Sequence, residues 1–243
     1  AIENTTGSYG SIQIDSTTGD WTYTLLDSAA TTLDQDEVQS NTFNVTVSDD
    51  QGATDSATIA VTLTGINDAP VISGDFSGEA TEDTLTITGS VSSTDTDDGS
   101  TASYSIANTV GNYGTINIDS TTGDWTYTLL DSAVTVLDIG DSETDTFNVT
   151  VSDDQSATDT QTLSLTITGV NDAPIILGDF SGSATENEAS VTGNIGSSDT
   201  DASSSASYAI ENTTGTYGSI QIDSVTGVWT YTLLESAATT LDQ

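Results

Sequence analysis

The chain has 243 residues, 38 of them Asp or Glu, and it contains no Lys, Arg, His, Cys or Met, so its formal net charge is −38. Without cationic side chains it cannot neutralise phosphates, which excludes nucleic-acid binding by the usual electrostatic route and attraction to anionic membrane surfaces. The missing His and Cys exclude imidazole bases, thiolate nucleophiles, zinc fingers, iron–sulfur sites and disulfides. The expected partners are therefore cations.

The apolar residues are numerous enough to build a core but not to cross a membrane. They make up 34% of the chain, and none of their runs approaches the roughly 20 residues that a spanning helix requires. The N-terminus, Ala1-Ile2-Glu3-Asn4, is neither cationic nor apolar enough for a signal peptide. We therefore expect a soluble chain with no membrane insertion.

An internal repeat of 104 residues runs through the whole chain without gaps. Its clearest markers are Tyr9-Gly10, Tyr113-Gly114 and Tyr217-Gly218, then Trp21, Trp125 and Trp229, then Asn67 to Pro70 and Asn171 to Pro174. Residues 1–35 differ from residues 209–243 at four positions but from residues 105–139 at nine. Alternate copies are thus closer than neighbours, a pattern typical of a longer array.

Within one repeat, short runs alternate apolar and polar residues, which is the pattern of half-buried β-strands. In chain order the predicted strands cover residues 85–91, 104–106, 113–118, 125–129, 146–151 and 163–167. The run at 146–151 places Phe147, Val149 and Val151 inward and Asn148 and Thr150 outward. Helical periodicity nowhere extends beyond one or two turns.

The segment 119–124, Asp-Ser-Thr-Thr-Gly-Asp, joins two predicted strands as a hairpin loop, with Gly123 expected at a positive φ. Asp15, Asp119 and Asp223 begin this loop in the three copies, whereas Asp20 and Asp124 are replaced by Val228 in the third. A turn-forming Asp explains both facts, so we interpret the loop as structural; a metal-ligand role for Asp119 is the weaker alternative.

Seven or more short strands in about 100 residues predict an all-β fold of tandem immunoglobulin-like β-sandwiches. Pro70 and Pro174 fix an extended backbone where one sandwich ends and the next begins. The predicted domains are a partial repeat at 1–68 without its N-terminal strands, a complete repeat at 69–172, and a partial repeat at 173–243 without its C-terminal strands. We favour a window cut from a longer chain over strand exchange between neighbouring molecules.

Acidic and amide side chains gather around each proline joint. Carboxylate and amide oxygens one or two residues apart in loops are hard ligands, and Ca²⁺ takes six to eight of them. Two carboxylates about 4 Å apart repel by about 4 kcal/mol at an effective dielectric constant of about 20, and this polypeptide has no cation to offset that. The candidate Ca²⁺ ligands are Asp49, Asn67, Asp68, Glu82, Asp95 and Asp97 at the first joint, and Asp153, Asn171, Asp172, Glu186, Asp199 and Asp201 at the second.

A simpler interpretation is that acidic loop residues form a solvated surface. For isolated residues such as Asp55 and Asp159 that is the better interpretation. At the joints we favour Ca²⁺, because the cluster repeats and brackets the proline.

Three stretches of the second repeat carry a family resemblance. They are Gly-x-Ile-x-Ile-Asp-x-x-x-Gly-x-Trp-Thr-Tyr-Thr-Leu at 114–129, the run from Asp145 to Asp153, and Thr-Gly-Val-Asn-Asp-Ala-Pro at 168–174. Together they resemble the VCBS repeat of very large bacterial surface proteins, including RTX-type adhesins, and more loosely cadherin-like modules. The resemblance spans essentially the whole chain.

The resemblance implies a Ca²⁺-binding, non-enzymatic extender of a secreted adhesin at the bacterial cell surface, supporting cell adhesion or biofilm formation. By similarity to cadherin-like joints, Asn67 and Asp68 would be linker ligands, Glu82 an early-strand ligand, Asp95 and Asp97 ligands of the following domain, and Asp49 one of the preceding domain. Asp98 departs from the pattern, because Ala202 stands at its equivalent position. Expected partners are calcium ions and neighbouring repeats; identical chains in a fibre are an open alternative.

Two other functions fit the sequence less well. A glycosidase would need two carboxylates at a set distance in a groove, one with a raised pKa, and nothing singles out such a pair. Exposed Thr-x-Thr pairs with Trp or Tyr, such as those around Trp125 and Tyr127, would suit a carbohydrate- or ice-binding module. Thr is, however, a common outward residue on strands, and alternation predicts that these aromatics point into the core.

Overall fold

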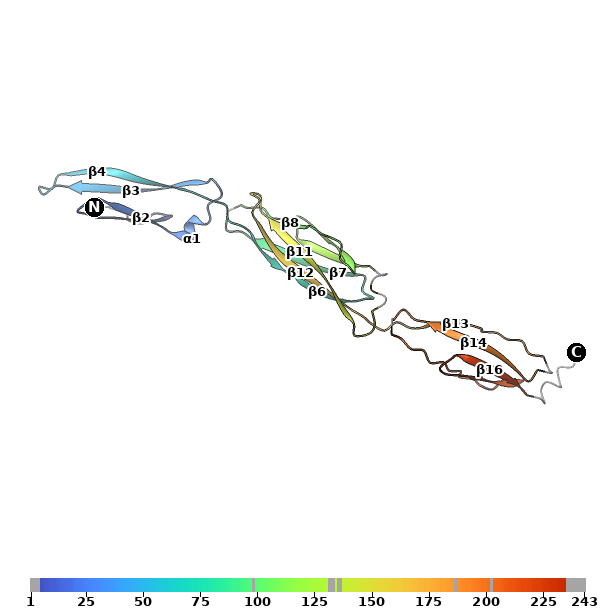
Figure 1. Cartoon of the computed structure of the whole chain (residues 1–243). Coiled ribbons are helices and arrows are strands. Elements are labelled where there is room, and N and C mark those ends of the chain that lie inside the picture. Colours follow the sequence, from blue (N-terminus) through green and yellow to red (C-terminus); the bar gives the residue numbers. More distant parts are fainter. Residues whose placement is uncertain are drawn as a thin grey trace. The chain divides into compact units, whose positions relative to one another are not determined.

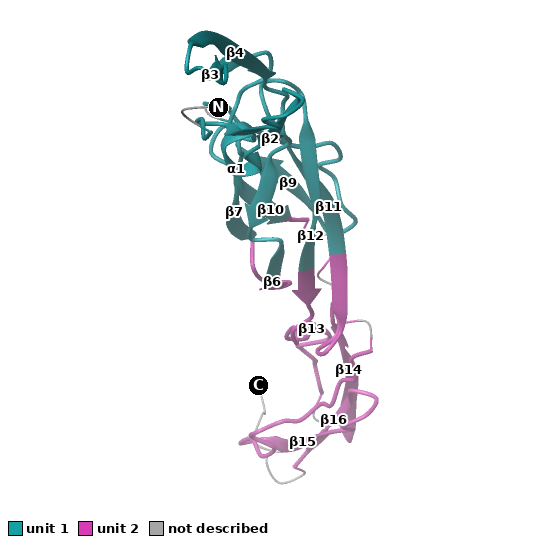
Figure 2. Ribbon diagram, turned by 90° about the vertical axis from the view of Figure 1, so that its left-hand side faces the viewer, with its two compact units in different colours: residues 1–78, 86–128, 145–165 teal, residues 79–85, 129–144, 166–243 magenta. Residues whose placement is uncertain are grey.

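A computed structural model describes residues 5–97, 99–130, 134, 137–185, 188–201 and 203–234, and these residues are almost entirely β-structure (Figure 1). They divide into two compact units (Figure 2). Unit 1 comprises residues 1–78, 86–128 and 145–165, and unit 2 comprises residues 79–85, 129–144 and 166–243. Within the described ranges no helix has the length and apolarity to span a membrane.

The N-terminal segment contains two antiparallel strand pairs and one helical turn. Strand β1 (Gly10–Ile14) pairs with β2 (Trp21–Leu25), which is followed by α1 (Asp27–Ala30). Strands β3 (Val38–Ser48) and β4 (Thr54–Thr64) form a long hairpin with Val38 opposite Thr64 and Ser48 opposite Thr54. This register places the loop 49–53 at one end of the hairpin and the chain exit after Thr64 at the other.

The middle segment has two four-stranded sheets. The first has the order β5-β7-β10-β9, from β5 (Val71–Gly74), β7 (Thr86–Thr94), β9 (Gly114–Ile118) and β10 (Asp124–Leu129). The second has the order β6-β12-β11-β8, from β6 (Ser77–Thr81), β8 (Ser103–Ile106), β11 (Ser142–Ser152) and β12 (Thr158–Thr168). This non-sequential strand order is that of an immunoglobulin-like sandwich.

The core of the middle segment consists of the inward residues of these strands. Trp125 is 2% exposed and Tyr127 0%, and Val149, Val151, Leu163 and Leu165 are fully buried. The Thr residues that alternate with them, Thr126 and Thr128, are exposed, as are Thr86 and Thr88 on β7. The expected alternation is therefore confirmed: here the aromatics fill the core and the hydroxyls face solvent.

The C-terminal segment has one four-stranded sheet with the order β13-β14-β16-β15. Its strands are β13 (Ile175–Gly178), β14 (Ser190–Ser198), β15 (Gly218–Ile222) and β16 (Val228–Leu233). The first three begin 104 residues after β5, β7 and β9, and β16 begins 104 residues after β10. The described residues after Thr168 contain no second sheet.

The six predicted strands are all present. Strands β11 and β12 begin four or five residues earlier than predicted, because polar residues on both faces continue their ladders. Strands β5 and β6 were not predicted, because neither Val-Ile-Ser-Gly nor Ser-Gly-Glu-Ala-Thr alternates apolar and polar residues. Each proline directly precedes a strand, Pro70 before β5 and Pro174 before β13.

The loop 119–124 has the predicted structural character. Gly123 has a φ of 76°, and its N–H donates to the Asp119 carbonyl at 3.0 Å. Asp119 Oδ1 accepts the N–H groups of Thr121 at 2.8 Å and Thr122 at 2.9 Å. These bonds, that of Thr122 first, lower the pKa of the exposed Asp119 carboxyl below its usual value.

Candidate metal site

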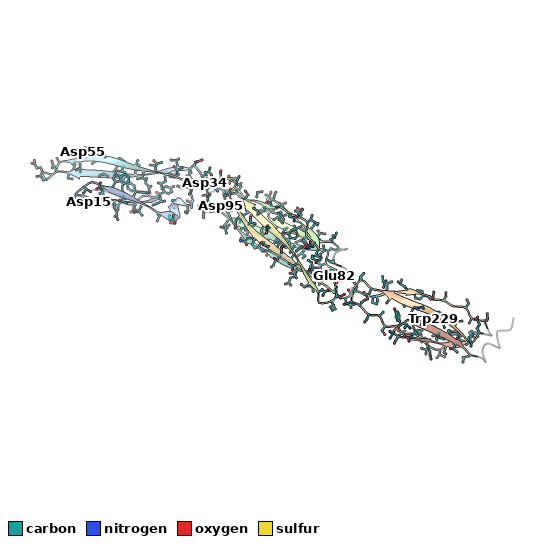
Figure 3. All side chains as sticks on the ribbon, in the orientation of Figure 1. Asp15, Asp34, Asp55, Glu82, Asp95 and Trp229 are labelled. Atoms are coloured by element: carbon teal, nitrogen blue, oxygen red, sulfur yellow. The ribbon has the colours of Figure 1, made fainter. Side chains whose placement is uncertain are left out.

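Two groups of acidic and amide side chains lie where strands end beside the two prolines. The first acidic cluster comprises Asp34, Asn67, Asp68, Asp95, Asp97 and Asp153, all in unit 1. The second acidic cluster comprises Glu82, Asp138, Asn171, Asp172, Asp199 and Asp201, all in unit 2. Each combines residues before, within and after one linker, and Figure 3 labels Asp34, Asp95 and Glu82 among them.

Asn67 connects the first linker to the following strands. Its Nδ2 donates to Asp153 Oδ2 at 2.9 Å and to the Asp68 carbonyl at 2.7 Å. Asp153 begins the loop between β11 and β12, 86 residues further along the chain. This amide therefore holds a carboxylate of the middle segment against the linker that precedes that segment.

Asp68, Asp95 and Asp97 form a chain of short contacts. The Asp68 N–H donates to Asp97 Oδ2 at 2.8 Å, and the Asp97 N–H donates to Asp95 Oδ1 at 3.1 Å. The Thr96 hydroxyl donates to Asp68 Oδ2 at 2.9 Å. Because β7 ends at Thr94, both Asp95 and Asp97 lie in the turn that follows it.

Two carboxylate oxygens of the first acidic cluster are buried without any hydrogen-bond donor, Asp95 Oδ2 and Asp97 Oδ1. Asp97 is only 7% exposed. Burial raises the pKa of its carboxyl; the Asp68 N–H opposes this shift, while the negative charges of Asp95, Asp68 and Asp34 add to it. The ionised form of Asp97 thus lacks a positive partner.

Asp153 is equally buried, at 7% exposed, but its carboxylate is well supplied with donors. Burial raises its pKa, but the Asn67 amide and the N–H groups of Ala157, Gln155 and Ser156 outweigh that effect, so the pKa lies below its usual value. Beside it, Asp34, Asn67, Asp97 and Asp154 line a small polar cavity of about 60 Å³. Asp153 is thus held ionised beside this polar cavity.

The second acidic cluster repeats this pattern. The Asp172 N–H donates to Asp201 Oδ2 at 3.0 Å, the Thr200 hydroxyl to Asp172 Oδ2 at 2.6 Å, and the Asp201 N–H to Asp199 Oδ1 at 3.2 Å. Asp201 is 9% exposed, and its Oδ1 is buried without a donor. Two equivalent linkers therefore carry equivalent carboxylate arrangements.

Glu82 and Asp138 complete the second acidic cluster from the middle segment. The Val170 N–H donates to Glu82 Oε1 at 2.6 Å, next to Asn171, while Glu82 Oε2 is buried without a donor. Asp138 accepts the backbone N–H of Ser203 at 3.1 Å and also its hydroxyl. Glu82 thus contacts the second linker itself, and Asp138 bonds to Ser203 on the far side of that linker.

The structure groups the predicted ligands differently from their order in the sequence. Glu82 lies at the second linker, because it follows β6, whose partner β12 leads into that linker. Asp153 lies at the first linker, through Asn67. Asn171, Asp172, Asp199 and Asp201 remain at the second linker, and Glu186 lies outside the described residues.

Asp49 is not brought to either acidic cluster. It lies in the exposed loop between β3 and β4, whereas Asn67 follows the other end of β4, eleven residues or about 35 Å away. In Figure 3, Asp55, near that loop, and Asp34 lie at opposite ends of the N-terminal segment. The Asp49 carboxylate accepts the N–H groups of Gln51 at 2.9 Å and Ala53 at 2.8 Å and so shapes the loop.

Sequence reasoning missed Asp34 and Asp138. Each follows a buried leucine, Leu33 at 4% and Leu137 at 8% exposed, which fixes the carboxylate at the end of its segment. The signal was the recurring Leu-Asp pair just before a long strand. Across the described residues, no three His, Cys, Asp or Glu side chains converge in a metal-binding arrangement. The four oxygens without donors are nonetheless the chemistry that a hard divalent cation satisfies.

Comparison with known proteins identifies the fold. Residues 67–169 match the model of the bacterial cadherin-like domain. Human CDH23 EC21-23 is 15% identical, with a TM-score of 0.52 over 93% of this chain and 72% of that one. PcdhgB3 EC1-4 is 16% identical, with a TM-score of 0.51 over 94% of this chain and 56% of that one.

Protocadherin gamma B2 extracellular cadherin domains 1-5 are 15% identical, with a TM-score of 0.48. This chain covers 46% of the length of that structure, and 96% of this chain is aligned. No curated protein matches the chain. The expected all-β, immunoglobulin-like sandwich is confirmed: the structure is an all-β, cadherin-like sandwich.

Proposed function

We propose that this chain is a non-enzymatic structural extender whose linkers are stiffened by Ca²⁺. The observation that carries the proposal is that four carboxylate oxygens are buried without donors, at Asp95 and Asp97 in the first acidic cluster and at Glu82 and Asp201 in the second. The chain has no Lys, Arg or His to neutralise them. Leaving buried charge unpaired costs several kcal/mol, which an external cation offsets.

At the first linker, Asp34, Asn67, Asp68, Asp95, Asp97 and Asp153 would hold the ion. At the second linker, Glu82, Asp138, Asn171, Asp172, Asp199 and Asp201 would do so. Bound Ca²⁺ supplies positive charge and takes oxygen ligands only, including amide and backbone carbonyls, which suits a set with few converging carboxylates. Because the ligands come from both sides of each linker, shared coordination would restrict hinge motion there.

The chain's own residues prepare each linker for this role. Pro70 and Pro174 limit the backbone conformations of the linkers, and Asn67 ties Asp153 to the linker in advance. Such preorganisation reduces the entropy that ion binding must overcome. The linker thus has few conformations to lose when its charge is neutralised.

The wider context is also proposed. The cadherin-like match at 67–169 and the recurrence of strands at 104 residues support three tandem segments, at 1–68, 69–172 and 173–243. The VCBS-type motifs support a role in a secreted, RTX-type adhesin at the bacterial cell surface, in adhesion or biofilm formation. The four carboxylate oxygens without donors lie beside the linkers, which supports a structural role over catalysis.

Calorimetry on the whole chain tests the proposal. Millimolar Ca²⁺ is expected to raise the melting temperature by about 10 °C or more relative to chelator, in line with a saturating ligand that contributes about 3–4 kcal/mol. Equilibrium dialysis in parallel should show saturable binding of Ca²⁺ by both acidic clusters.

The matched control compares the double variant Asp97→Asn with Asp201→Asn to the double variant Asp50→Asn with Asp55→Asn. Both double variants remove two negative charges, but Asp50 and Asp55 are exposed and lie in or beside the loop between β3 and β4, away from both acidic clusters. The first pair should lose most of the Ca²⁺ response and the second pair should retain it. Equal responses of the two pairs, or no response in the native chain, would refute the proposal.

A further inference from the structure

Two hydrogen bonds between one pair of residues cross the second linker. Asp138 lies before β11 in the middle segment, and Ser203 lies in the turn after β14 in the C-terminal segment. The Ser203 N–H donates to Asp138 Oδ1 at 3.1 Å, and the Ser203 hydroxyl donates to Asp138 Oδ2. Both residues belong to unit 2. A carboxylate on one side of the linker thus binds two donors of a single residue on the other side.

Asp138 is oriented by the turn in which it lies. Its N–H donates to Asp141 Oδ2 at 3.2 Å, and the Asp141 N–H donates to the Asp138 carbonyl at 2.9 Å. The N-terminal copy has the same two bonds: the Asp34 N–H donates to Glu37 Oε2 at 3.3 Å, and the Glu37 N–H donates to the Asp34 carbonyl at 2.9 Å. The turn that carries this aspartate is therefore the same before both linkers.

The position of Ser203 is occupied differently at the first linker. Residues 95–99 read Asp-Thr-Asp-Asp-Gly after β7, and residues 199–203 read Asp-Thr-Asp-Ala-Ser after β14. Gly99 has no hydroxyl, and its φ of 84° lies in the left-handed region, which Ser203 does not adopt. Within the described ranges, no hydrogen bond reaches the Asp34 carboxylate. The two linkers therefore share the acceptor but not the donors.

We propose that Asp138 and Ser203 form a latch that restricts the second linker without metal, and that the first linker lacks this latch because Gly99 replaces Ser203. A carboxylate is a stronger acceptor than a neutral oxygen, and the latch uses both of its oxygens. Ser203 is exposed and Asp138 half-buried, so water competes for both groups. We expect a modest effect, with the closed form of the linker favoured about tenfold by the two bonds.

The latch is compatible with a bound cation. Each carboxylate oxygen accepts more than one bond, so Asp138 keeps acceptor sites for an ion while both Ser203 donors are engaged. The role of the latch in the response to Ca²⁺ rests on the proposed function of the linkers. If Ca²⁺ stiffens them, the second linker starts from a partly ordered state and changes less on binding the ion. Loss of Ca²⁺ should then loosen the first linker more than the second.

Distance measurements between spin labels on the whole chain test the latch in chelator. Labels at Thr162→Cys and Thr192→Cys, both exposed, report on the second linker. Ser203→Gly removes the hydroxyl and frees the backbone, so the population of open conformations should rise about tenfold and the distance distribution should broaden. Ser203→Ala keeps the N–H donor and should have a smaller effect. The matched control Ser205→Gly, at an exposed position two residues further on, should leave the distribution as in the native chain.

The reciprocal exchange asks whether the latch can be transferred. Asp98→Ala with Gly99→Ser gives the first linker the residues of the second, and labels at Thr62→Cys and Thr126→Cys report on it. The exchanged chain should show a narrower distribution in chelator than the native chain. Asp98→Ala alone removes the same charge without adding a hydroxyl and should show no narrowing.

The latch and the proposed function fail separately. An unchanged distribution in Ser203→Gly, or equal narrowing in Asp98→Ala and in the exchanged chain, would overturn the latch whatever Ca²⁺ does. Broadening in Ser203→Gly together with narrowing only in the exchanged chain would support it. A native chain that ignores Ca²⁺ would refute the proposed function and leave these results in chelator intact.

Discussion

Residues 5–64 and 109–168 are copies of one stretch of sequence, but they are packed differently. Trp21 is 49% exposed and Trp125 2%; Asp49 is exposed in its loop, while Asp153 is 7% exposed and bonded to Asn67. The loops themselves are the same, since both aspartates accept two backbone N–H groups at 2.9 and 2.8 Å. Local sequence thus sets the loop, and the surrounding segments decide whether it joins a candidate metal site.

The tryptophan copies offer the largest contrast. Trp125→Ala should lower the free energy of unfolding of its segment by about 3–5 kcal/mol, because it opens a cavity in a closed core. Trp21→Ala should cost about 1 kcal/mol, because half of that side chain already faces water. Denaturant unfolding followed by near-ultraviolet circular dichroism measures both, and equal losses would contradict the difference in packing.

A buried polar pair gives the next contrast. Asp145, 3% exposed, accepts the Tyr127 hydroxyl at 2.6 Å and the N–H groups of Asn112 at 2.8 Å and Tyr113 at 3.0 Å. Burial first, and then this carboxylate, raises the pKa of Tyr127 far above its usual value. In the N-terminal copy Asn41 takes the position of Asp145 and donates its amide to Tyr23 at 2.7 Å.

Asp145→Ala should therefore cost about 2–4 kcal/mol, because it removes the acceptor of the buried Tyr127 hydroxyl and of two part-buried N–H groups. Asp145→Asn should cost about half as much, since Asn41 shows that an amide is accommodated at this position. Thermal unfolding of the two variants checks the ranking. If Asp145→Ala and Asp145→Asn cost the same, the hydrogen bonds that the Asp145 carboxylate accepts do not contribute to stability.

Substitution of Asp97 should have opposite effects on stability in the absence and in the presence of Ca²⁺. Its folded-state pKa is raised, so the metal-free folded state binds protons more readily, and stability from this group grows as pH falls through that pKa and is lost as pH rises. In chelator at neutral pH, Asp97→Asn should therefore stabilise the chain by about 1–3 kcal/mol, the scale of a buried unpaired polar group. In Ca²⁺ it should destabilise the chain relative to native.

Calorimetry of this variant with and without Ca²⁺ measures both expected changes in stability. Asp50→Asn, which removes the same charge from an exposed loop, should change neither by more than about 0.5 kcal/mol. An Asp97→Asn variant that is less stable in chelator as well would show that the carboxylate stabilises the metal-free fold.

The loop aspartates give the smallest contrast. Asp153→Asn should weaken Ca²⁺ binding about tenfold, because it removes a charge beside Asn67 in the first acidic cluster. Asp49→Asn, with the same loop bonds, should leave Ca²⁺ binding unchanged. Equilibrium dialysis measures the Ca²⁺ affinity of both variants. An equal loss of affinity in the two would place Asp49 near a bound ion.

Much of the fold could be predicted from the sequence because its determinants are local. Alternation identified the strands that carry Trp125, Phe147 and Leu163, and turn chemistry identified the loop at Asp119. The short strands β5 and β6 escaped detection, since too few residues alternate in them.

The composition of the candidate sites was harder to predict, because it depends on contacts far apart in the sequence. Proximity along the chain grouped Glu82 with Asn67, but pairing of β6 with β12 places it beside Val170. Likewise, Asp34 is separated from Asp97 by 63 positions in the numbering and is related to it only through the fold. The order of the strands in the sheets decides this grouping, and it could not be predicted from the sequence.

Distance measurements between spin labels test the central claim most directly. Since the chain has no cysteine, labels at Thr62→Cys and Thr126→Cys, both exposed, report on the first linker alone, and labels at Thr162→Cys and Thr192→Cys report on the second. The account predicts broad distance distributions in chelator that narrow in Ca²⁺, and no narrowing when Asp97→Asn and Asp201→Asn are present. Distributions of the same width with and without Ca²⁺ would contradict it.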